Sequence, residues 1–336
     1  MAEDQTDIPP NHLTPKTDGP AGSPSVLREI FFGPRELRAG WRLLIFLATL
    51  IGCFIIVVLL ARLLLPPPPS TVQPLAVTAT GLGLGLALFL AVLAAAFVMS
   101  RIEKRPMKAY GMPLRSAFQA KFWVGAVWGF VALTLLLGGL YAMGDFDFGR
   151  PLLHGPDIAI YGGAWFISFV FTGLFEEYLF RGYPQFTLTT GMGFWPSAIV
   201  LSIVFALAHS TNPGESKLGV FQIIPFAIFF CLTLRRTGSL WFAVGFHAAW
   251  DWGQSYFYGI ADSGFVTQGH LLNSSFHGPT LMTGGSVGPE GSILILPLFV
   301  LTLVVFHLTH RKANYPDPEF LIPMKHSADS LAATGR

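Results

Sequence analysis

Charged residues are scarce in this chain. Asp, Glu, Lys and Arg make up only 12% of its 336 residues, whereas an average soluble domain contains roughly 25%. Hydrophobic residues make up 52% of the chain, and its mean hydropathy is +0.56. This balance excludes an ordinary water-soluble domain, and we expect an integral membrane protein.

Cysteine is almost absent, and the chain shows no secretion signal. Cys53 and Cys231 are the only two cysteines, and both lie in apolar runs, which excludes a disulfide framework. Residues 1–26 are polar and Pro-rich and lack the apolar core of a signal peptide, so we expect a disordered cytoplasmic tail that is not cleaved. The net charge of +2 is mild and gives no indication of a nucleic-acid partner.

Long uncharged runs fill most of the sequence. A helix needs about 20 residues to cross a bilayer. Four runs approach or exceed this length, at 43–61, 76–99, 122–143 and 158–175. Four more are shorter or interrupted by polar residues, at 194–208, 218–234, 240–258 and 293–306. The sequence therefore predicts an all-α, polytopic membrane helix bundle with about eight transmembrane helices.

Basic residues gather at one end of these runs. They precede the first run, fill the connection between the second and third, and follow the sixth and the eighth. By the positive-inside rule, we expect a multi-pass protein of the cell membrane with both termini in the cytoplasm. The predicted division of the chain is the tail 1–26, an interfacial segment 27–40, a transmembrane domain 41–312 and a second cytoplasmic tail 313–336.

Three charged residues interrupt the end of the fourth run, in the stretch GLFEEYLFRGY. Glu177 and Arg181 are four residues apart and share a helix face, so they can form an ion pair. Glu176 is five residues from Arg181 and remains an unpaired carboxylate that points elsewhere. The alternative is that all three lie in the headgroup layer, where charges cost little.

Two further polar positions occur in apolar runs. His209 directly follows the fifth run, at a helix end, where a histidine is often only a helix-capping or interfacial residue. His247 and Asp251 are four apart on one face of the seventh run, and ionisable residues inside a membrane span mark a functional site by default. At about 1.5 Å per helical residue, Glu176 and His209 both lie roughly 20 Å from the turn between their helices. His247 and Asp251 can reach the same level. Pro184 is the obstacle, because proline disfavours a straight helix.

These groups are suited to activating water. One possibility is a metal such as zinc or another divalent cation, held by His209, His247 and a carboxylate from Glu176 or Asp251. The other is that Glu176 acts directly as a general base while the imidazoles bind water and the developing oxyanion.

The motifs resemble those of a known family, the CAAX protease and bacteriocin-processing enzyme (CPBP) family of intramembrane proteases, which includes the type II CAAX prenyl endopeptidases. The family has E-E-x-x-x-R, F-x-x-x-H and H-x-x-x-N or a close variant, in this order. Here they read EEYLFR at 176–181, FALAH at 205–209 and HAAWD at 247–251. The resemblance covers about 158–258, which we expect to be the protease-like core.

The resemblance implies roles for these residues. Glu176 would activate water, His209 and His247 would bind or polarise it, and Glu177 with Arg181 would support the site.

Phe205 begins the second motif and is assigned to structural support. Asp251 stands where the best-known members have Asn, and its extra negative charge would favour a metal or a protonated imidazole.

The predicted function is that of an intramembrane endopeptidase, metallo- or glutamic-type, with the four catalytic candidates Glu176, His209, His247 and Asp251. Its substrates would be membrane-associated or lipid-modified peptides or proteins in the lipid bilayer. The alternative is a non-proteolytic scaffold or regulatory partner that retains the protease fold. A transporter with a carboxylate relay is disfavoured, because the two halves of the chain lack paired interrupted helices.

Overall fold

The computed structural model describes residues 31–33, 37–64 and 74–321. The predicted tail 1–26 lies outside the described residues, as does 322–336. Of the predicted interfacial segment 27–40, the structure describes 31–33 and 37–40, and a helix has already begun at Ala39.

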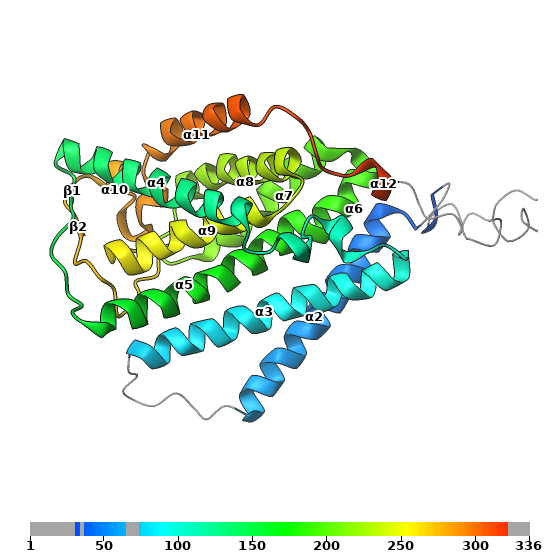
Figure 1. The fold of residues 1–336 in the computed structure, drawn as a ribbon, viewed down its shortest axis with the longest axis horizontal. Coiled ribbons are helices and arrows are strands. Elements are labelled where there is room, and N and C mark those ends of the chain that lie inside the picture. The colour runs from blue at the N-terminus through cyan, green and yellow to red at the C-terminus, as the bar shows by residue number, and fades with distance from the viewer. Residues whose placement is uncertain (1–30, 34–36, 65–73, 322–336) are drawn as a thin grey trace, which may run out of the picture.

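Helices form nearly all of the described part (Figure 1). The longer ones are α2 (Ala39–Leu64), α3 (Pro74–Glu103), α4 (Ala120–Met143), α5 (Pro156–Glu177), α6 (Tyr183–Met192), α7 (Phe194–Ala208), α8 (Lys217–Thr237), α9 (Trp241–Trp252) and α11 (Ile295–Thr309). Short helices are α10 (Thr280–Thr283) and α12 (Pro318–Leu321). Within the described ranges the only strands are β1 (Phe146–Asp147) and β2 (Ser275–Phe276), which pair antiparallel.

The prediction of a polytopic helical membrane protein is confirmed. Among the described residues, 6 helices are long and apolar enough to cross a bilayer, and the segment Pro156–Met192 counts as one of them. The seventh predicted run forms α9 and a π-helical turn (Gly253–Tyr258), and the eighth forms the shorter helix α11. The number eight therefore stays a prediction.

Helix α9 occupies the centre of the bundle. It packs against α4, α5 and α8, and its residues from Trp241 to Asp251 are buried (Figure 1). The contact with α4 is close because glycine occupies the crossing: a Cβ added to Gly125 would lie 2.1 Å from the Phe242 carbonyl oxygen, and one added to Gly129 would lie 2.2 Å from that of Phe246. Small residues permit such backbone approach between membrane helices.

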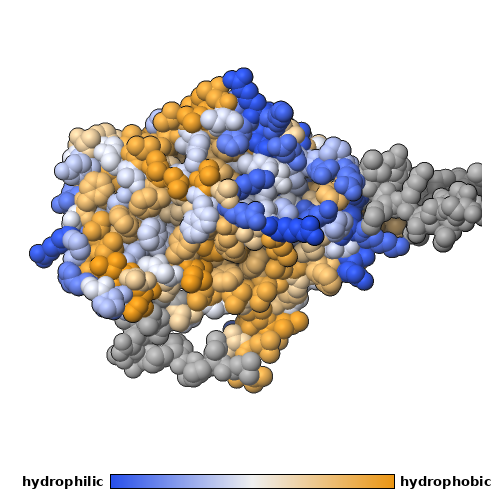
Figure 2. Space-filling model, in the orientation of Figure 1, coloured by the Kyte–Doolittle hydropathy of each residue, from blue (hydrophilic) through white to orange (hydrophobic). Residues whose placement is uncertain are grey.

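The outer surface is largely apolar. Helix α2 is exposed along most of its length and presents Leu44, Ile51, Ile55, Leu59 and Leu63. Figure 2 shows apolar residues over much of the middle of the molecule, with strongly hydrophilic residues gathered toward the end that carries α6 and α12. An exposed apolar surface of this kind is what contact with lipid requires.

The predicted second tail begins as a packed segment. Tyr315 is buried, and its carbonyl oxygen accepts a hydrogen bond from the Arg235 guanidinium at the end of α8. The short helix α12 follows. Residues 313–321 therefore contact the bundle at the end where α8 and α6 terminate.

The predicted orientation can be tested by labelling cysteines. Leu114, in the connection between α3 and α4, is 76% exposed, and Leu152, in the connection between α4 and α5, is 47% exposed. We expect a membrane-impermeant maleimide to label Leu152→Cys in intact cells and Leu114→Cys only after the membrane is opened. The unsubstituted protein is the control for its two native cysteines. Labelling of Leu114→Cys in intact cells would place the termini outside.

Candidate active site

The two adjacent glutamates lie where the regular α-helix gives way to a π-helical turn. Glu176 and Glu177 end α5, and the chain continues through a π-helical turn, Tyr178–Gly182, into α6. Pro184 lies in the first turn of α6, where its missing N–H is tolerated. The helical segment therefore continues past Pro184, as the argument that places Glu176 and His209 at one level assumes. It does so with a π turn that ends at Gly182, shortly before the proline. Such turns occur frequently at functional sites.

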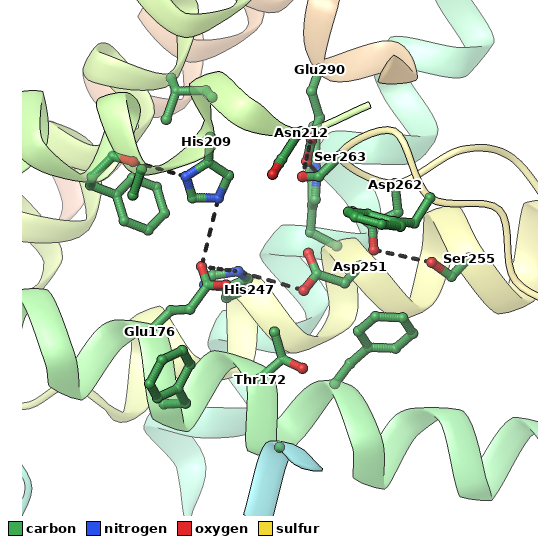
Figure 3. A pocket seen from close by; sticks show the side chains of 18 of the residues that line it. Thr172, Glu176, His209, Asn212, His247, Asp251, Ser255, Asp262, Ser263 and Glu290 are labelled. Atoms are coloured by element: carbon green, nitrogen blue, oxygen red, sulfur yellow. Dashed lines mark hydrogen bonds and ion pairs between the residues drawn. The ribbon is translucent and has the colours of Figure 1, made fainter. Parts of the chain in front are cut away.

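The structure brings the four catalytic candidates together (Figure 3). The Nε2 atom of His209 is 3.9 Å from the Oε2 atom of Glu176, and the Nε2 atom of His247 is 3.6 Å from the same oxygen. The Nε2 atom of His247 is also 3.5 Å from the Oδ2 atom of Asp251. Residues from α5, from the end of α7 and from α9 therefore meet at one point.

Contacts at the other ring nitrogens fix the orientation of both imidazoles. The Nδ1 atom of His209 is 2.8 Å from the Phe205 carbonyl oxygen, which can only accept, so Nδ1 carries the hydrogen. The Nδ1 atom of His247 is 3.0 Å from the Oε1 atom of Glu177. Both Nε2 atoms are consequently directed toward Glu176.

Acceptors crowd around His247. Carboxylate oxygens of Glu176 and Asp251 lie near its Nε2 atom, and a carboxylate oxygen of Glu177 lies near its Nδ1 atom. Like charges at this spacing repel unless a positive charge lies between them. That charge can be a proton on the Nε2 atom of His247 or a metal ion bound beside it.

The predicted ion pair between Glu177 and Arg181 is present, with 3.3 Å between Oε1 and Nη1. Both side chains are 0% exposed, so neither contacts lipid headgroups. The Arg181 guanidinium lies 4.3 Å from the centre of the Phe205 ring. Phe205 therefore contacts Arg181 through its ring and orients His209 through its carbonyl oxygen.

Glu176 is the carboxylate that remains available. Its side chain is 21% exposed, and within the described part of the chain its Oε2 atom has no hydrogen-bond donor. Glu176, His209, His247 and Asp251 line a cavity of about 690 Å³ whose walls come largely from apolar residues of α3, α5 and α8. This volume falls in the usual range for ligand pockets.

The three motifs and this geometry agree with a comparison against known families. Residues 160–253 match the family model described as type II CAAX prenyl endopeptidase Rce1-like. This segment belongs to the CAAX protease family. At the family level, this match supports a CAAX-type intramembrane protease. No curated protein and no solved structure matches the chain significantly.

The CAAX protease segment contains all seven residues selected from the sequence: Glu176, Glu177, Arg181, Phe205, His209, His247 and Asp251. The structure adds one contact that spacing did not predict, because Glu177 bonds to His247 as well as to Arg181. This contact joins two helices, and a rule that relates residues on one helix cannot find it.

Two carboxylates outside the CAAX protease segment also reach the cavity. Asp262 and Glu290 are the only acidic residues of the connection 259–292, and both line the cavity near Asp251 (Figure 3). Burial, together with the neighbouring charges of Asp251 and Glu290, raises the pKa of Asp262 well above its usual value. In the sequence, Asp262 and Glu290 stand out only as isolated acidic residues in a polar connection. The sequence gives no indication that this connection folds over the site.

Proposed function

We propose that the chain is an intramembrane endopeptidase that hydrolyses peptide bonds in membrane-associated or lipid-modified peptides, with Glu176 as the general base. The observation that carries this proposal is the position of the Glu176 carboxylate. It faces two imidazoles at the wall of a cavity, and its Oε2 atom has no donor among the described residues. A free, positioned carboxylate beside imidazoles is the arrangement that proton transfer from water needs.

The proposed reaction is a hydrolysis in which Glu176 moves one proton. Its carboxylate takes a proton from water, and the resulting hydroxide oxygen bonds to the carbonyl carbon of the peptide. An imidazole N–H at His247 donates to the tetrahedral oxyanion, and Asp251 stabilises the positive charge of that ring. Glu176 then passes the proton to the leaving amine nitrogen as the C–N bond breaks. Glu177 holds the His247 ring in place through its Nδ1 atom.

A divalent metal fits the same residues. The Nε2 atoms of His209 and His247 face a carboxylate oxygen of Glu176, and each ring bonds through Nδ1 to an oxygen acceptor, as metal-binding histidines usually do. A zinc ion bound there would supply Lewis acidity to the peptide carbonyl and the attacking water. With Asp251 as the third protein ligand, Glu176 would remain available as the base.

The metal content of the purified protein tests whether a metal ion takes part. We expect purified protein to contain about one divalent metal ion per chain. His247→Ala should reduce that content, because it removes one ligand. A strong chelator should remove the metal and the cleavage activity together. Full activity in protein with far less than one metal per chain would leave Glu176 acting on water without a metal.

The function itself is tested by comparing membrane peptides from cells that contain the wild-type protein with those from cells that contain Glu176→Gln. Accumulation of uncut peptides and loss of their products in the variant supports a protease. Identical peptide profiles, with both proteins present at equal levels, would support the alternative of a non-proteolytic scaffold or regulatory partner.

A further inference from the structure

One amide side chain on the wall of the cavity is not used by the fold. Asn212 follows the 3-10 turn His209–Thr211 at the end of α7, and it lines the same cavity as Glu176 and His247. It is partly buried, and Figure 3 shows its side chain pointing into the cavity. Its carboxamide has no hydrogen-bond partner among the described residues. Two N–H donors and one carbonyl acceptor are therefore available to a ligand.

The other side-chain N–H groups on the described wall are already engaged. Each indole and amide N–H donates to an oxygen atom of the protein at 3.0 or 3.1 Å, in the pairs Trp165 with Gln268, Gln222 with Ser292 and Trp250 with Glu290. The imidazoles of His209 and His247 bond through Nδ1 and direct Nε2 toward Glu176. Within the described ranges, Asn212 is thus the amide that remains for a substrate.

Hydrogen bonds fix the backbone of Asn212. Its N–H donates to the carbonyl oxygen of His209 at 3.0 Å, and its own carbonyl oxygen accepts from the N–H of Glu215 at 3.1 Å. Pro213 follows, and a residue before proline is restricted to extended conformations. Asn212 has such a conformation, with φ at −65° and ψ at 148°. A side chain on a backbone held in this way is preorganised for binding.

The connection 259–292 also holds this turn. A Cβ added to Gly264 would lie 2.1 Å from the Pro213 carbonyl oxygen, and one added to Gly214 would lie 2.1 Å from the Oγ atom of Ser286. Both glycines have positive φ, at 86° and 76°, which glycine adopts without strain. The turn therefore cannot withdraw from the cavity unless the connection moves with it.

We propose that Asn212 binds the main chain of the peptide substrate by donating from Nδ2 to a backbone carbonyl oxygen near the scissile bond. The assignment rests on the proposed function in that it takes a peptide as the ligand. The largely apolar walls suit apolar side chains, but a peptide group buried there without a hydrogen bond is costly. A carboxamide offers the donor and the acceptor that a peptide group needs. Asn212 thus recognises what substrates of different sequence share.

Binding of a fluorescent peptide to the purified full-length protein tests this proposal. The probe is a short, acetylated and amidated peptide of alanine, leucine and phenylalanine that carries a fluorophore. Glu176→Gln is the parent protein, because it prevents cleavage and lets fluorescence anisotropy report affinity alone. Adding Asn212→Ala should weaken binding roughly tenfold. Asn212→Asp keeps the shape of the side chain but loses the N–H donors, and it should weaken binding at least as much.

A matched control and a modified peptide make the test specific. Asn273→Ala removes an exposed amide outside the cavity and should leave the affinity unchanged. In the peptide, each peptide group is replaced in turn by an ester, whose carbonyl oxygen is a weaker acceptor. One ester position should weaken binding to the parent protein and have little further effect in Asn212→Ala, because the two changes remove the same hydrogen bond. If Asn212→Ala does not fold, Asn212→Asp takes its place.

Three results would overturn the proposal. They are equal affinity in Asn212→Ala and its parent, ester effects of the same size in both proteins, and, on a cleaved peptide, a lower kcat with an unchanged KM. The last result would make Asn212 a donor to the transition state alone. A peptide that binds through Asn212 but is never cut by the wild-type protein would contradict the proposed function and support this assignment.

Discussion

Glu176→Gln is expected to lower the rate of peptide cleavage by at least roughly 10²- to 10⁴-fold, the usual contribution of a general base, while the protein stays folded. The amide has nearly the shape of the carboxylate but cannot take a proton from water. The fold should tolerate the change, because the Oε2 atom of Glu176 makes no hydrogen bond within the described ranges. The rate is measured on a peptide identified as a substrate, and folding by thermal unfolding in detergent.

The matched control for this experiment is Glu215→Gln. Glu215 lies in the connection between α7 and α8, is partly buried, and accepts a hydrogen bond from the Ser216 backbone N–H. It does not line the cavity. The control should cleave at the wild-type rate, and retained cleavage in Glu176→Gln would exclude Glu176 as the base.

Glu177→Ala is expected to reduce the free energy of unfolding by about 3 to 5 kcal/mol, the usual cost of removing one partner from a buried ion pair. Arg181 would keep its charge at 0% exposure without a carboxylate. His247 would also lose its partner at Nδ1, so any protein that folds should cleave slowly. Thermal unfolding in detergent gives the stability, and the cleavage assay gives the rate.

A double variant distinguishes the ion pair from simple loss of side-chain volume. Glu177→Gln with Arg181→Met removes both charges and should be more stable than Glu177→Gln alone, because no unpaired cation is then buried. If Glu177→Ala melts at the wild-type temperature, the ion pair does not support the site.

Much of the site could be predicted because its residues follow helical spacing. The interval of four residues predicted the contact between Glu177 and Arg181, and the observed distance is 3.3 Å. Helix rise predicted that Glu176 and His209 lie at one level, and their side chains approach to 3.9 Å. Both arguments use only positions along regular helices, where the geometry is fixed by the backbone.

Contacts that depend on irregular backbone could not be predicted in this way. The π turn after Glu177 changes the helical register before Pro184, and periodicity gives no sign of it. Asp262 and Glu290 reach the cavity only because the connection 259–292 folds back over α9. The number of transmembrane helices could not be fixed from hydrophobicity either. Helix α9 is buried on all sides, so its apolar residues reflect contacts with protein as much as with lipid.

The close glycine contact between α4 and α9 makes one wall of the cavity more rigid than the other. Backbone contact at Gly125 and Gly129 leaves no side chains that could rearrange, so α9 and its residues His247 and Asp251 are held as one rigid body with α4. The opposite wall includes α3, which packs against α5 and against the largely exposed helix α2. We therefore expect a bulky substrate to enter by displacing α3 and α2 toward the lipid, while the catalytic geometry on α9 remains stationary.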